Sequence, residues 1–476
     1  MTSFSQYFRL GKTQSELDFV DVPVDGDIPL FVDPFAISQR VDRWSQECHR
    51  ALITFFQGVV DNIRSGRYER AKELLLHLRE PNETRLGLSA GQPQGAGIGR
   101  FQADLIYEAL RDSSAVRTGF LSSLEECELM IEGIGWDKIS DLTTNIIRSH
   151  LADYSREQCS LHNVPVEAVA QPACFDPNLM QWVARYLELP MCGQLPVLLV
   201  PKAIARFSLD YDHNRYYRHF VLNYLRTESL EASSALVRTL RNGKKVVYKK
   251  DLERIFPCTK DLLYRFSRDH PHVLEEYREA LERLERIDKR SEVDPEDETT
   301  IAAALVRALE TIPPGNAGAS EYHNLMVGIV EFLFFPNLLY PRKEREIHEG
   351  RKRIDILMEN GARGGIFHRL HDVRRIPCAY VPFECKNYLT EVANPELDQL
   401  AGRFSVNRGM VGFLCCRRFE DRALFIRRCK DTLVDGRGLI LPFDDETITR
   451  YLSIIEDGQR EQLELQLSRL VDEVCL

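Results

Sequence analysis

The sequence predicts a mixed α/β protein (α+β), in which a largely helical mixed α/β N-terminal region precedes a C-terminal domain with a mixed central sheet. Two observations support this prediction. The chain has 476 residues, which is too long for one ordinary domain. After the polar, acidic stretch 288–300, hydrophobic spacing changes between helical and strand periods in the order α-β-β-β-α-β-α-β-α. We therefore expect a sheet-based domain to follow a separate N-terminal region.

The N-terminal region combines strand and helix patterns. Residues 18–32 alternate around a turn signal at Asp25-Gly26, which predicts a hairpin. Residues 48–63 are apolar at helical spacing, whereas residues 195–200 predict a buried strand. Residues 288–300 cannot bury a core and predict a linker. The expected organisation is a mixed α/β recognition domain over 1–180, a helical middle domain over 181–287, a linker region over 288–318 and the C-terminal domain over 319–476.

Each element of the C-terminal domain follows from a local pattern. An apolar helix over 322–335 comes first. Asn394 and Pro395 provide an N-cap and a first-turn proline for a second helix. The other expected elements are strands over 344–348, 353–359, 380–388, 410–415 and 438–441, and helices over 421–433 and from 444 onward.

Composition excludes several classes of protein. A net charge of −10 argues against a histone-like coating protein, although a local basic patch can still meet a charged substrate. The twelve cysteines include no CxxC pair, which indicates reduced thiols instead of a disulfide framework. The longest apolar stretch is too short to span a bilayer comfortably. We therefore expect a soluble cytoplasmic protein with no membrane contact.

The predicted strand around residue 384 carries the residues of greatest chemical interest. Side chains alternate between the faces of a strand, so Glu384 and Lys386 share one face while the opposite face is apolar. The preceding strand carries Asp355 opposite its own apolar face. If the two strands pair, these three side chains meet. Two carboxylates can hold a hard cation such as Mg²⁺, which activates a water, and a lysine can orient that water or stabilise a phosphate under attack.

Two helices supply further candidate residues. Glu331 is the one charged residue within an apolar helix, and a buried carboxylate is costly unless it is paired or bound to a metal. The helix after the third strand is expected to present Gln399, Arg403 and Asn407 as one polar stripe, because these residues are spaced four apart. Residues 301–440 have 21 Lys and Arg against 17 Asp and Glu, so the basic excess lies in the domain with the candidate site.

These residues resemble the PD-(D/E)XK nuclease superfamily, the restriction-endonuclease-like fold. The matching positions are Asp355 in RKRIDIL, Glu384 and Lys386 in PFECKNY, the upstream helix residue Glu331, and Gln399, where Mrr-like members of the superfamily place a glutamine. The resemblance covers residues 319–450 and implies an αβββαβ core with a mixed central sheet. Residues 1–300 resemble no family known to us.

The chain departs from the superfamily pattern at two positions. Ile354, in place of proline, precedes the aspartate. Pro382 lies inside the third strand, where it would remove one hydrogen bond of the ladder.

The resemblance implies a Mg²⁺-dependent (or Mn²⁺-dependent) endonuclease that hydrolyses phosphodiester bonds, with DNA favoured over RNA. Asp355, Glu384 and Glu331 would hold the metal, Lys386 would position the water, and Gln399 would support the scissile phosphate or Lys386. Residues 1–300 would recognise a trigger, a protein partner or the target, or would form an oligomer, as in a bacterial restriction or phage-defence (antiviral) effector. The expected nucleic-acid contacts are Arg351, Lys352, Arg353, Arg403, Arg417 and Arg418.

Other interpretations remain open from the sequence. Asp355, Glu384 and Lys386 also fit an ordinary cross-strand salt bridge, in a nuclease fold that has lost activity and serves as a binding or scaffold subunit. A transposition or repair nuclease is a further alternative. The remaining motifs have weaker signals: His368 and His371 for zinc, the glycine-rich loop 87–99 for nucleotide binding, and the basic hairpin-like stretch 241–250 for nucleic acid.

Overall fold

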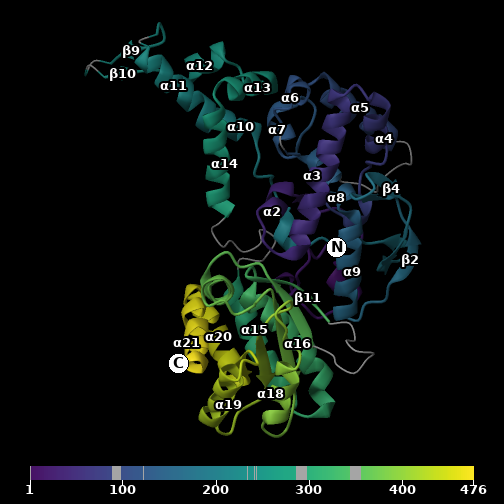
Figure 1. Ribbon diagram of the computed structural model, residues 1–476, viewed down its shortest axis with the longest axis vertical. Helices are drawn as coiled ribbons and strands as arrows, with labels where there is room; N and C mark the ends of the chain where they lie inside the picture. The colour runs from purple at the N-terminus through teal and green to yellow at the C-terminus, as the bar shows by residue number, and fades with distance from the viewer. Residues whose placement is uncertain are drawn as a thin grey trace.

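The computed structural model describes residues 2–87, 98–121, 123–232, 234–240, 242, 244–285, 297–343 and 355–476. The chain forms two parts that follow each other along the longest axis of the molecule (Figure 1). Residues up to 285 make up most of the upper part, and residues from 297 onward make up most of the lower part. The mixed α/β class is confirmed, with a five-stranded sheet in the lower part. Among the described residues, we find no helix whose length and apolar character would let it cross a membrane.

The N-terminal part consists of helices and short two-stranded pairs. Its helices are α1 (Phe4–Tyr7), α2 (Pro34–Ser38), α3 (Arg43–Arg64), α4 (Tyr68–Leu75), α5 (Ile98–Asp112), α6 (Ser114–Thr118), α7 (Glu126–Met130), α8 (Trp136–Ile146) and α9 (Arg148–Leu161). Its strands are β1 (Phe31–Val32), β2 (Glu167–Ala170), β3 (Cys174–Asp176), β4 (Gln181–Val183), β5 (Tyr186–Leu189), β6 (Met191–Cys192), β7 (Leu195–Pro196) and β8 (Ala205–Arg206).

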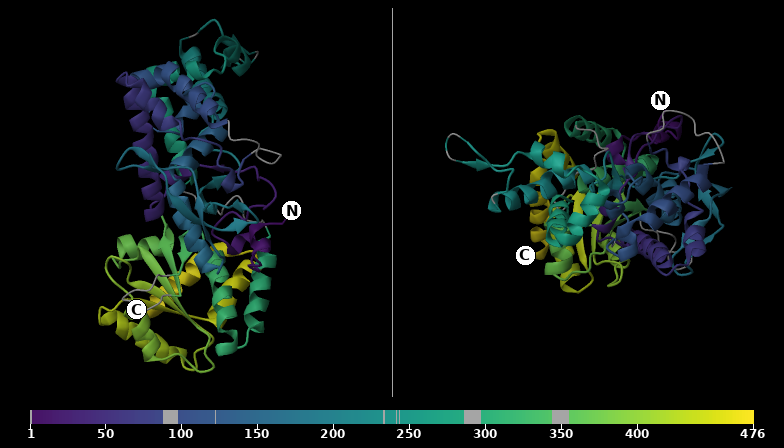
Figure 2. Two further views of the ribbon diagram at one scale, coloured as in Figure 1. Left: turned by 90° about the vertical axis from the view of Figure 1, so that its right-hand side faces the viewer. Right: turned by 90° about the horizontal axis from the view of Figure 1, so that it is seen from above.

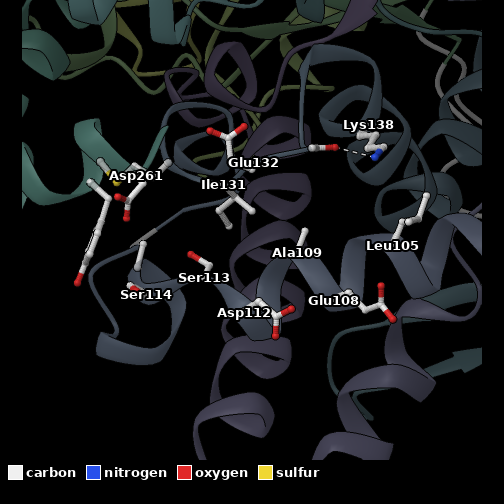
Figure 3. Close-up of a pocket in the computed structure, with 14 residues that line it drawn as sticks. Leu105, Glu108, Ala109, Asp112, Ser113, Ser114, Ile131, Glu132, Lys138 and Asp261 are labelled. Atoms are coloured by element: carbon white, nitrogen blue, oxygen red, sulfur yellow. Dashed lines mark hydrogen bonds between the residues drawn. The ribbon is translucent and has the colours of Figure 1, made fainter. Parts of the chain in front are cut away.

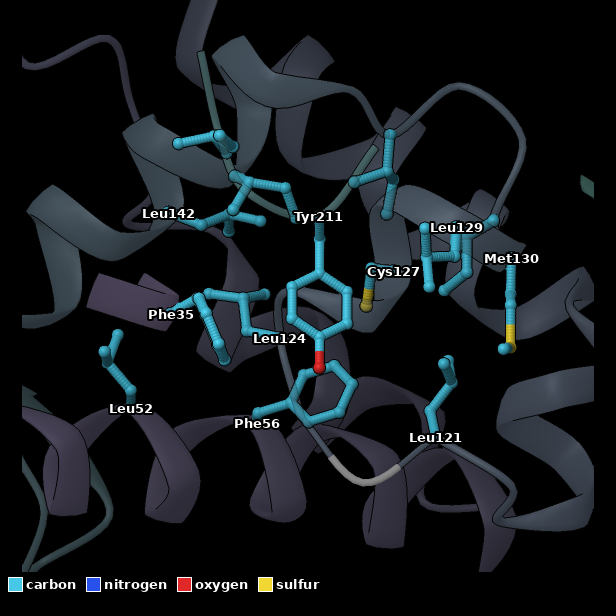
Figure 4. Packing of buried hydrophobic residues seen from close by; sticks show 14 of the residues in the cluster. Phe35, Leu52, Phe56, Leu121, Leu124, Cys127, Leu129, Met130, Leu142 and Tyr211 are labelled. Atoms are coloured by element: carbon cyan, nitrogen blue, oxygen red, sulfur yellow. The ribbon is translucent and has the colours of Figure 1, made fainter. Parts of the chain in front are cut away.

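Helix α3 organises the N-terminal core. It begins where the Asp42 carboxylate accepts the Ser45 main-chain N–H at 2.8 Å, and its apolar residues recur at helical spacing on one buried face. Figure 4 shows Tyr211 inserted between side chains of this helix and those of the segment leading into α7. One continuous hydrophobic cluster extends from Phe31 to Leu281. Residues 1–180 and 181–287 therefore share a core.

Two strand predictions for this part are wrong. Residues 18–32 do not form a hairpin, because Phe31 and Val32 pair with β8, far along the chain. The predicted strand over 195–200 is limited to β7, although residues 197–200 are buried. In both segments the chain is covered by distant residues, and burial without a regular ladder produces the same apolar sequence pattern as a strand.

An arm extends from the N-terminal part. It comprises α10 (His213–Tyr216), α11 (Leu222–Glu231), β9 (Arg238–Thr239), β10 (Lys245–Val246), α12 (Lys249–Ile255), α13 (Lys260–Asp269) and α14 (Pro271–Glu285). Strands β9 and β10 pair antiparallel, so the predicted hairpin in this basic segment is confirmed. In both Figure 1 and Figure 2 this hairpin projects away from the rest of the molecule.

The C-terminal part keeps most of the predicted order of elements, but its first strand lies at 338–342, where none was predicted, and a short helix separates the second and third strands. The elements are α15 (Glu298–Thr311), α16 (Ala319–Phe334), β11 (Leu338–Arg342), β12 (Ile356–Asn360), α17 (Gly365–His368), β13 (Tyr380–Lys386), α18 (Asn394–Ala401), β14 (Val411–Cys416), α19 (Arg422–Val434), β15 (Leu439–Asp444), α20 (Asp445–Glu456) and α21 (Leu463–Cys475). Helix α15 lies within the predicted linker region, yet its apolar face joins the C-terminal core. Residues 286–296 and the predicted strand over 344–348 lie outside the described residues.

The sheet is mixed, in the order β11-β12-β13-β14-β15. Strands β11, β12 and β13 pair antiparallel, and β13, β14 and β15 pair parallel. Phe383, Phe413 and Phe443 share one face, where the ring of Phe334 on α16 packs against all three at centroid distances of 5.3–5.9 Å. Glu384 alternates with Phe383 and therefore lies on the other face.

Pro382 does not interrupt the pairing of β13. Leu357 of β12 lies opposite Pro382, and the ladder to β14 begins at Phe383. Main-chain N–H groups alternate between the two sides of a strand, and the Cys385 N–H faces β12. The Pro382 nitrogen therefore faces β14, where the ladder has not yet begun, so no ladder hydrogen bond is lost.

Gly412 makes room for Pro382 on the facing strand. A Cβ at Gly412 would lie 2.9 Å from the Pro382 carbonyl oxygen and 2.9 Å from the ring of Phe404. We expect Gly412→Ala to lower the free energy of unfolding by about 1–3 kcal/mol, because backbone and a packed ring must both move. Thermal and urea denaturation measure the effect. Gly135→Ala is the control, because its Cβ would meet nothing within 4 Å; equal effects of the two substitutions would contradict this account.

The two parts meet at a third hydrophobic cluster. It joins residues of the N-terminal segment, α9 and the segment before β8 to Phe335, Leu339 and Tyr340 of the C-terminal part. Polar contacts accompany it: the Tyr340 main-chain N–H donates to an Asp18 carboxylate oxygen at 3.2 Å, and the Tyr154 hydroxyl donates to the other at 2.7 Å. Burial raises the pKa of Asp18, although these hydrogen bonds oppose the shift. The parts therefore share a packed interface.

Candidate nuclease site

Asp355 lies beside β13, as the strand alternation predicts. The register of the β12–β13 ladder pairs Ile356 with Phe383, so Asp355 stands opposite Glu384 at the end of the ladder. One Asp355 carboxylate oxygen accepts the main-chain N–H of Cys385 at 2.8 Å. This hydrogen bond places the carboxylate against the strand between Glu384 and Lys386. Directly opposed residues of antiparallel strands share a face, so the register puts Asp355 on the side of the sheet that carries Glu384 and Lys386, as the prediction requires for the three side chains to meet.

Glu384 is the centre of the group. Its side chain is 1% exposed, and its Oε1 lies 2.7 Å from the Lys386 ammonium. Its Oε2 forms an ion pair with the Arg403 guanidinium, whose side chain is 3% exposed. Two cations in contact with a buried carboxylate offset much of the free-energy cost of removing its charge from water. Glu384 is therefore held in one orientation by contacts on both of its oxygens.

Arg403 has a different position from the one expected. Helix α18 ends at Ala401, so Arg403 and Asn407 are not part of a polar stripe on this helix, and that prediction is wrong. The chain turns after α18 and brings Arg403 to the face of β13 that carries Glu384. Arg403 is thus a buried partner of a carboxylate, which leaves it unsuited to the predicted role as a surface contact for phosphate.

The structure places Glu331 elsewhere, which corrects the prediction that it completes the site. Helix α16 packs on the sheet face opposite Glu384, and the Glu331 side chain is fully buried at the interface with the N-terminal part. There its Oε1 lies 3.2 Å from the Lys202 ammonium. The Lys202 ammonium also lies over the Phe335 ring, 4.3 Å from its centroid. The sequence argument that a buried carboxylate needs a cation was sound, but the cation is a distant lysine.

The other predicted residues do not gather at Glu384. Gln399 is exposed on α18, and its side chain has no hydrogen bond among the described residues. Arg417 pairs with Asp445 at 3.1 Å and donates to the Ile312 carbonyl at 2.9 Å, so it holds α15 and α20 together. Arg418 is an exposed residue beside Glu420. Arg351, Lys352 and Arg353 lie outside the described residues.

His323 is a neighbour of the site that sequence reasoning missed. It lies on α16, and its ring Nε2 is 3.1 Å from the Asp355 main-chain oxygen. Burial lowers the pKa of His323, so its neutral form is favoured near neutral pH. A single histidine in the first turns of a helix carries no distinctive sequence signal. Only the folded position of Asp355 reveals the contact.

The donor set fits a hard cation in part. Asp355 and Glu384 supply carboxylate oxygens, the ligand type that Mg²⁺ and Mn²⁺ prefer. The second Asp355 oxygen has no hydrogen bond within the described part of the chain. Both Glu384 oxygens already contact cationic groups. A metal ion would therefore have to displace Arg403 from Oε2 or bind that oxygen together with it.

Comparison with known proteins identifies only part of the chain. Residues 9–212 match the model of a family described as a domain of unknown function (DUF8370). The match ends before the C-terminal part and so does not include Asp355, Glu384 or Lys386. No curated protein matches the chain, and no solved structure matches it either.

The matched region contains an acidic grouping. Ligand atoms of Glu128, Asp212 and His213 lie within 4.8 Å of one another. The His213 ring Nδ1 is 2.6 Å from Glu128, and Asp212 caps α10 by accepting the Arg215 main-chain N–H at 2.6 Å. These contacts explain the grouping without a metal ion. The zinc interpretation of His368 and His371 is also unsupported, because the former pairs with Asp372 and the latter accepts the Cys378 main-chain N–H.

A pocket of about 430 Å³ lies between α5, α6, the loop before α8 and α13 (Figure 3). Its lining carries Glu108, Asp112, Glu132 and Asp261 against one lysine, Lys138. The Lys138 ammonium donates to the Gly133 carbonyl at 2.6 Å, so it is held at the wall. An acidic lining repels phosphate groups, and we therefore do not place phosphodiester chemistry in this pocket.

Most of the glycine-rich loop 87–99 lies outside the described residues.

Proposed function

We propose that the C-terminal part, residues 297–476, is a Mg²⁺- or Mn²⁺-dependent endonuclease that hydrolyses phosphodiester bonds in DNA. The observation that carries the proposal is that the Asp355 carboxylate contacts β13 at the Cys385 N–H, between Glu384 and Lys386, whose side chains pair with each other. The element order and the mixed sheet agree with the restriction-endonuclease-like fold, to which these residues have a motif resemblance.

Each residue of the group has a distinct role in this proposal. Asp355 and Glu384 would hold the cation, which supplies an activated water and offsets charge on the phosphate. Lys386 would orient the attacking water and stabilise negative charge that develops on the phosphate in the transition state. Glu384 holds the Lys386 ammonium in place at 2.7 Å, so this cation is positioned before substrate binds.

Arg403 supports a second candidate function. Its ion pair with Glu384 satisfies a carboxylate that a nuclease needs for its metal. A nuclease fold that has lost activity and serves as a binding or scaffold subunit would keep such a pair as a structural salt bridge. An active enzyme requires that the metal compete with the guanidinium for Oε2.

The N-terminal part would act as a sensing or targeting module. A large module packed against a nuclease fold is the arrangement of a bacterial restriction or phage-defence effector, and the same core also serves transposition and repair nucleases. These assignments are analogies at the level of the fold. The contacts between the parts at Asp18 and Glu331 give such a module a physical connection to the site's domain.

Cleavage assays with the full chain test the proposal. Labelled single- and double-stranded DNA and RNA are incubated with Mg²⁺, with Mn²⁺ and with EDTA. We expect metal-dependent cleavage of DNA that Asp355→Asn abolishes. Metal-independent cleavage would overturn the proposed chemistry. If no substrate is cut and Mg²⁺ leaves the melting temperature of wild type and Asp355→Asn equally unchanged, the scaffold function replaces the nuclease.

A further inference from the structure

The basic hairpin, residues 238–254, has no role in the proposed cleavage site. It includes β9, β10 and most of α12, and it projects from the arm at a distance from the C-terminal sheet (Figures 1 and 2). Seven of its residues are Lys or Arg and two are Asp or Glu, in a chain whose net charge is −10. Positive charge is thus concentrated on one projecting element of an acidic protein.

The cationic side chains are available at the surface. Lys244, Lys245 and Lys250 are exposed, and none of the three has an ion-pair partner within the described residues. The Arg238 guanidinium pairs with Asp251 at 2.9 Å and also lies over the Tyr248 ring, 5.4 Å from its centroid. Tyr248 is 47% exposed, so the hairpin presents an aromatic face beside its lysines.

The base of the hairpin is anchored in the protein core. Val247 is 2% exposed and Leu252 is fully buried, and both belong to the main N-terminal hydrophobic cluster. The Lys249 ammonium donates to the Arg218 carbonyl at 2.8 Å, which fixes the start of α12 against the segment between α10 and α11. The lysines therefore extend from a rigid support. An ordinary solvent-exposed turn requires neither an anchor in the core nor several lysines without acidic partners.

We propose that the basic hairpin binds the phosphate backbone of duplex DNA. Exposed lysines release condensed counterions when they contact phosphates, and a neighbouring tyrosine can pack against sugar or base. An anionic membrane fits less well, because Val247 and Leu252 are buried in the core and Leu240, 38% exposed, is the one large aliphatic side chain that the described residues of the hairpin expose for insertion into lipid. The inference rests on the proposed function only for the choice of DNA, since phosphate binding follows from the hairpin itself.

Binding of the full chain to labelled duplex DNA, measured by fluorescence anisotropy in EDTA at several salt concentrations, tests the inference. The triple variant Lys244→Gln/Lys245→Gln/Lys250→Gln should bind about 10- to 100-fold more weakly, and the slope of log affinity against log salt should fall by about 2–3, roughly 0.9 per phosphate contact. The control variant Arg9→Gln/Arg50→Gln/Arg67→Gln removes the same charge from exposed sites elsewhere.

The outcomes separate this inference from the nuclease proposal. If the protein binds duplex DNA through the hairpin but cuts no substrate, the result supports the inference and contradicts the proposed nuclease activity. Equal loss of affinity in the triple variant and its control would overturn the inference, as would absence of binding by wild type. Lysine-dependent binding to phosphatidylserine vesicles, without binding to duplex, would replace the DNA assignment with a membrane surface.

Discussion

Replacing Lys386 by methionine is expected to slow DNA cleavage by roughly 10²- to 10⁴-fold while leaving the fold intact. The ammonium lies 2.7 Å from Glu384 and its side chain is 12% exposed, and in the proposed nuclease it stabilises the charge that develops on the phosphate. Its removal leaves Glu384 paired with Arg403, and the buried carboxylate keeps a counter-charge. Initial rates on the substrate that wild type cuts, together with melting temperatures, measure the two effects.

The choice of companion variants follows from the same contacts. Asp355→Asn should also abolish cleavage and should remove any Mg²⁺-dependent rise in melting temperature, whereas Lys386→Met should keep that rise. Glu384→Gln is a poor probe, because it leaves the Arg403 guanidinium buried without its carboxylate partner and destabilises the fold. Lys430→Met, on α19, controls for loss of a lysine in the same part of the chain. Wild-type cleavage by Lys386→Met would show that the group is an ordinary salt bridge.

The sequence was sufficient for the central strands of the C-terminal part. Strict alternation around Phe383 and Glu384 predicts which side chains face the helix and which face the candidate site, and the ladder with β12 confirms this assignment. The adjacent position of Asp355 follows from the same alternation once β12 and β13 pair. A period of two residues is a local property of a strand, and local properties can be read from one sequence.

The charged partners could not be predicted because they depend on distant residues. Arg403 reaches Glu384 only because α18 ends at Ala401 and the chain turns back toward the sheet. Glu331 finds Lys202 only because the N-terminal part covers α16. A charged residue within an apolar segment predicts that a partner of opposite charge exists, but the sequence does not identify that partner. The domain boundaries were difficult to predict for the same reason. Nothing in the sequence of α15 indicates that its apolar face packs in the C-terminal core.

The Lys202–Glu331 ion pair gives the second large expected effect, which concerns stability. Both side chains are fully buried, with the ammonium 3.2 Å from Oε1. Lys202→Met should lower the free energy of unfolding by about 3–5 kcal/mol, because it removes a counter-charge from a carboxylate that cannot reach water. Lys12 is a weaker substitute: it lies near Glu331, but burial lowers its pKa. Urea denaturation monitored separately for each part measures the loss.

The double variant Lys202→Met/Glu331→Leu distinguishes an ion-pair effect from a packing effect. Apolar residues of similar volume often replace a buried pair without loss, so the double variant should recover most of the stability that Lys202→Met loses. The exposed pair formed by Lys72 and Asp104, at 2.8 Å, is the control, and Lys72→Met should cost no more than about 1 kcal/mol. A Lys202→Met effect as small as that of Lys72→Met would contradict the account. Because the pair joins α16 to the N-terminal part, its loss should also expose new protease sites at the interface, which limited proteolysis of the variant detects.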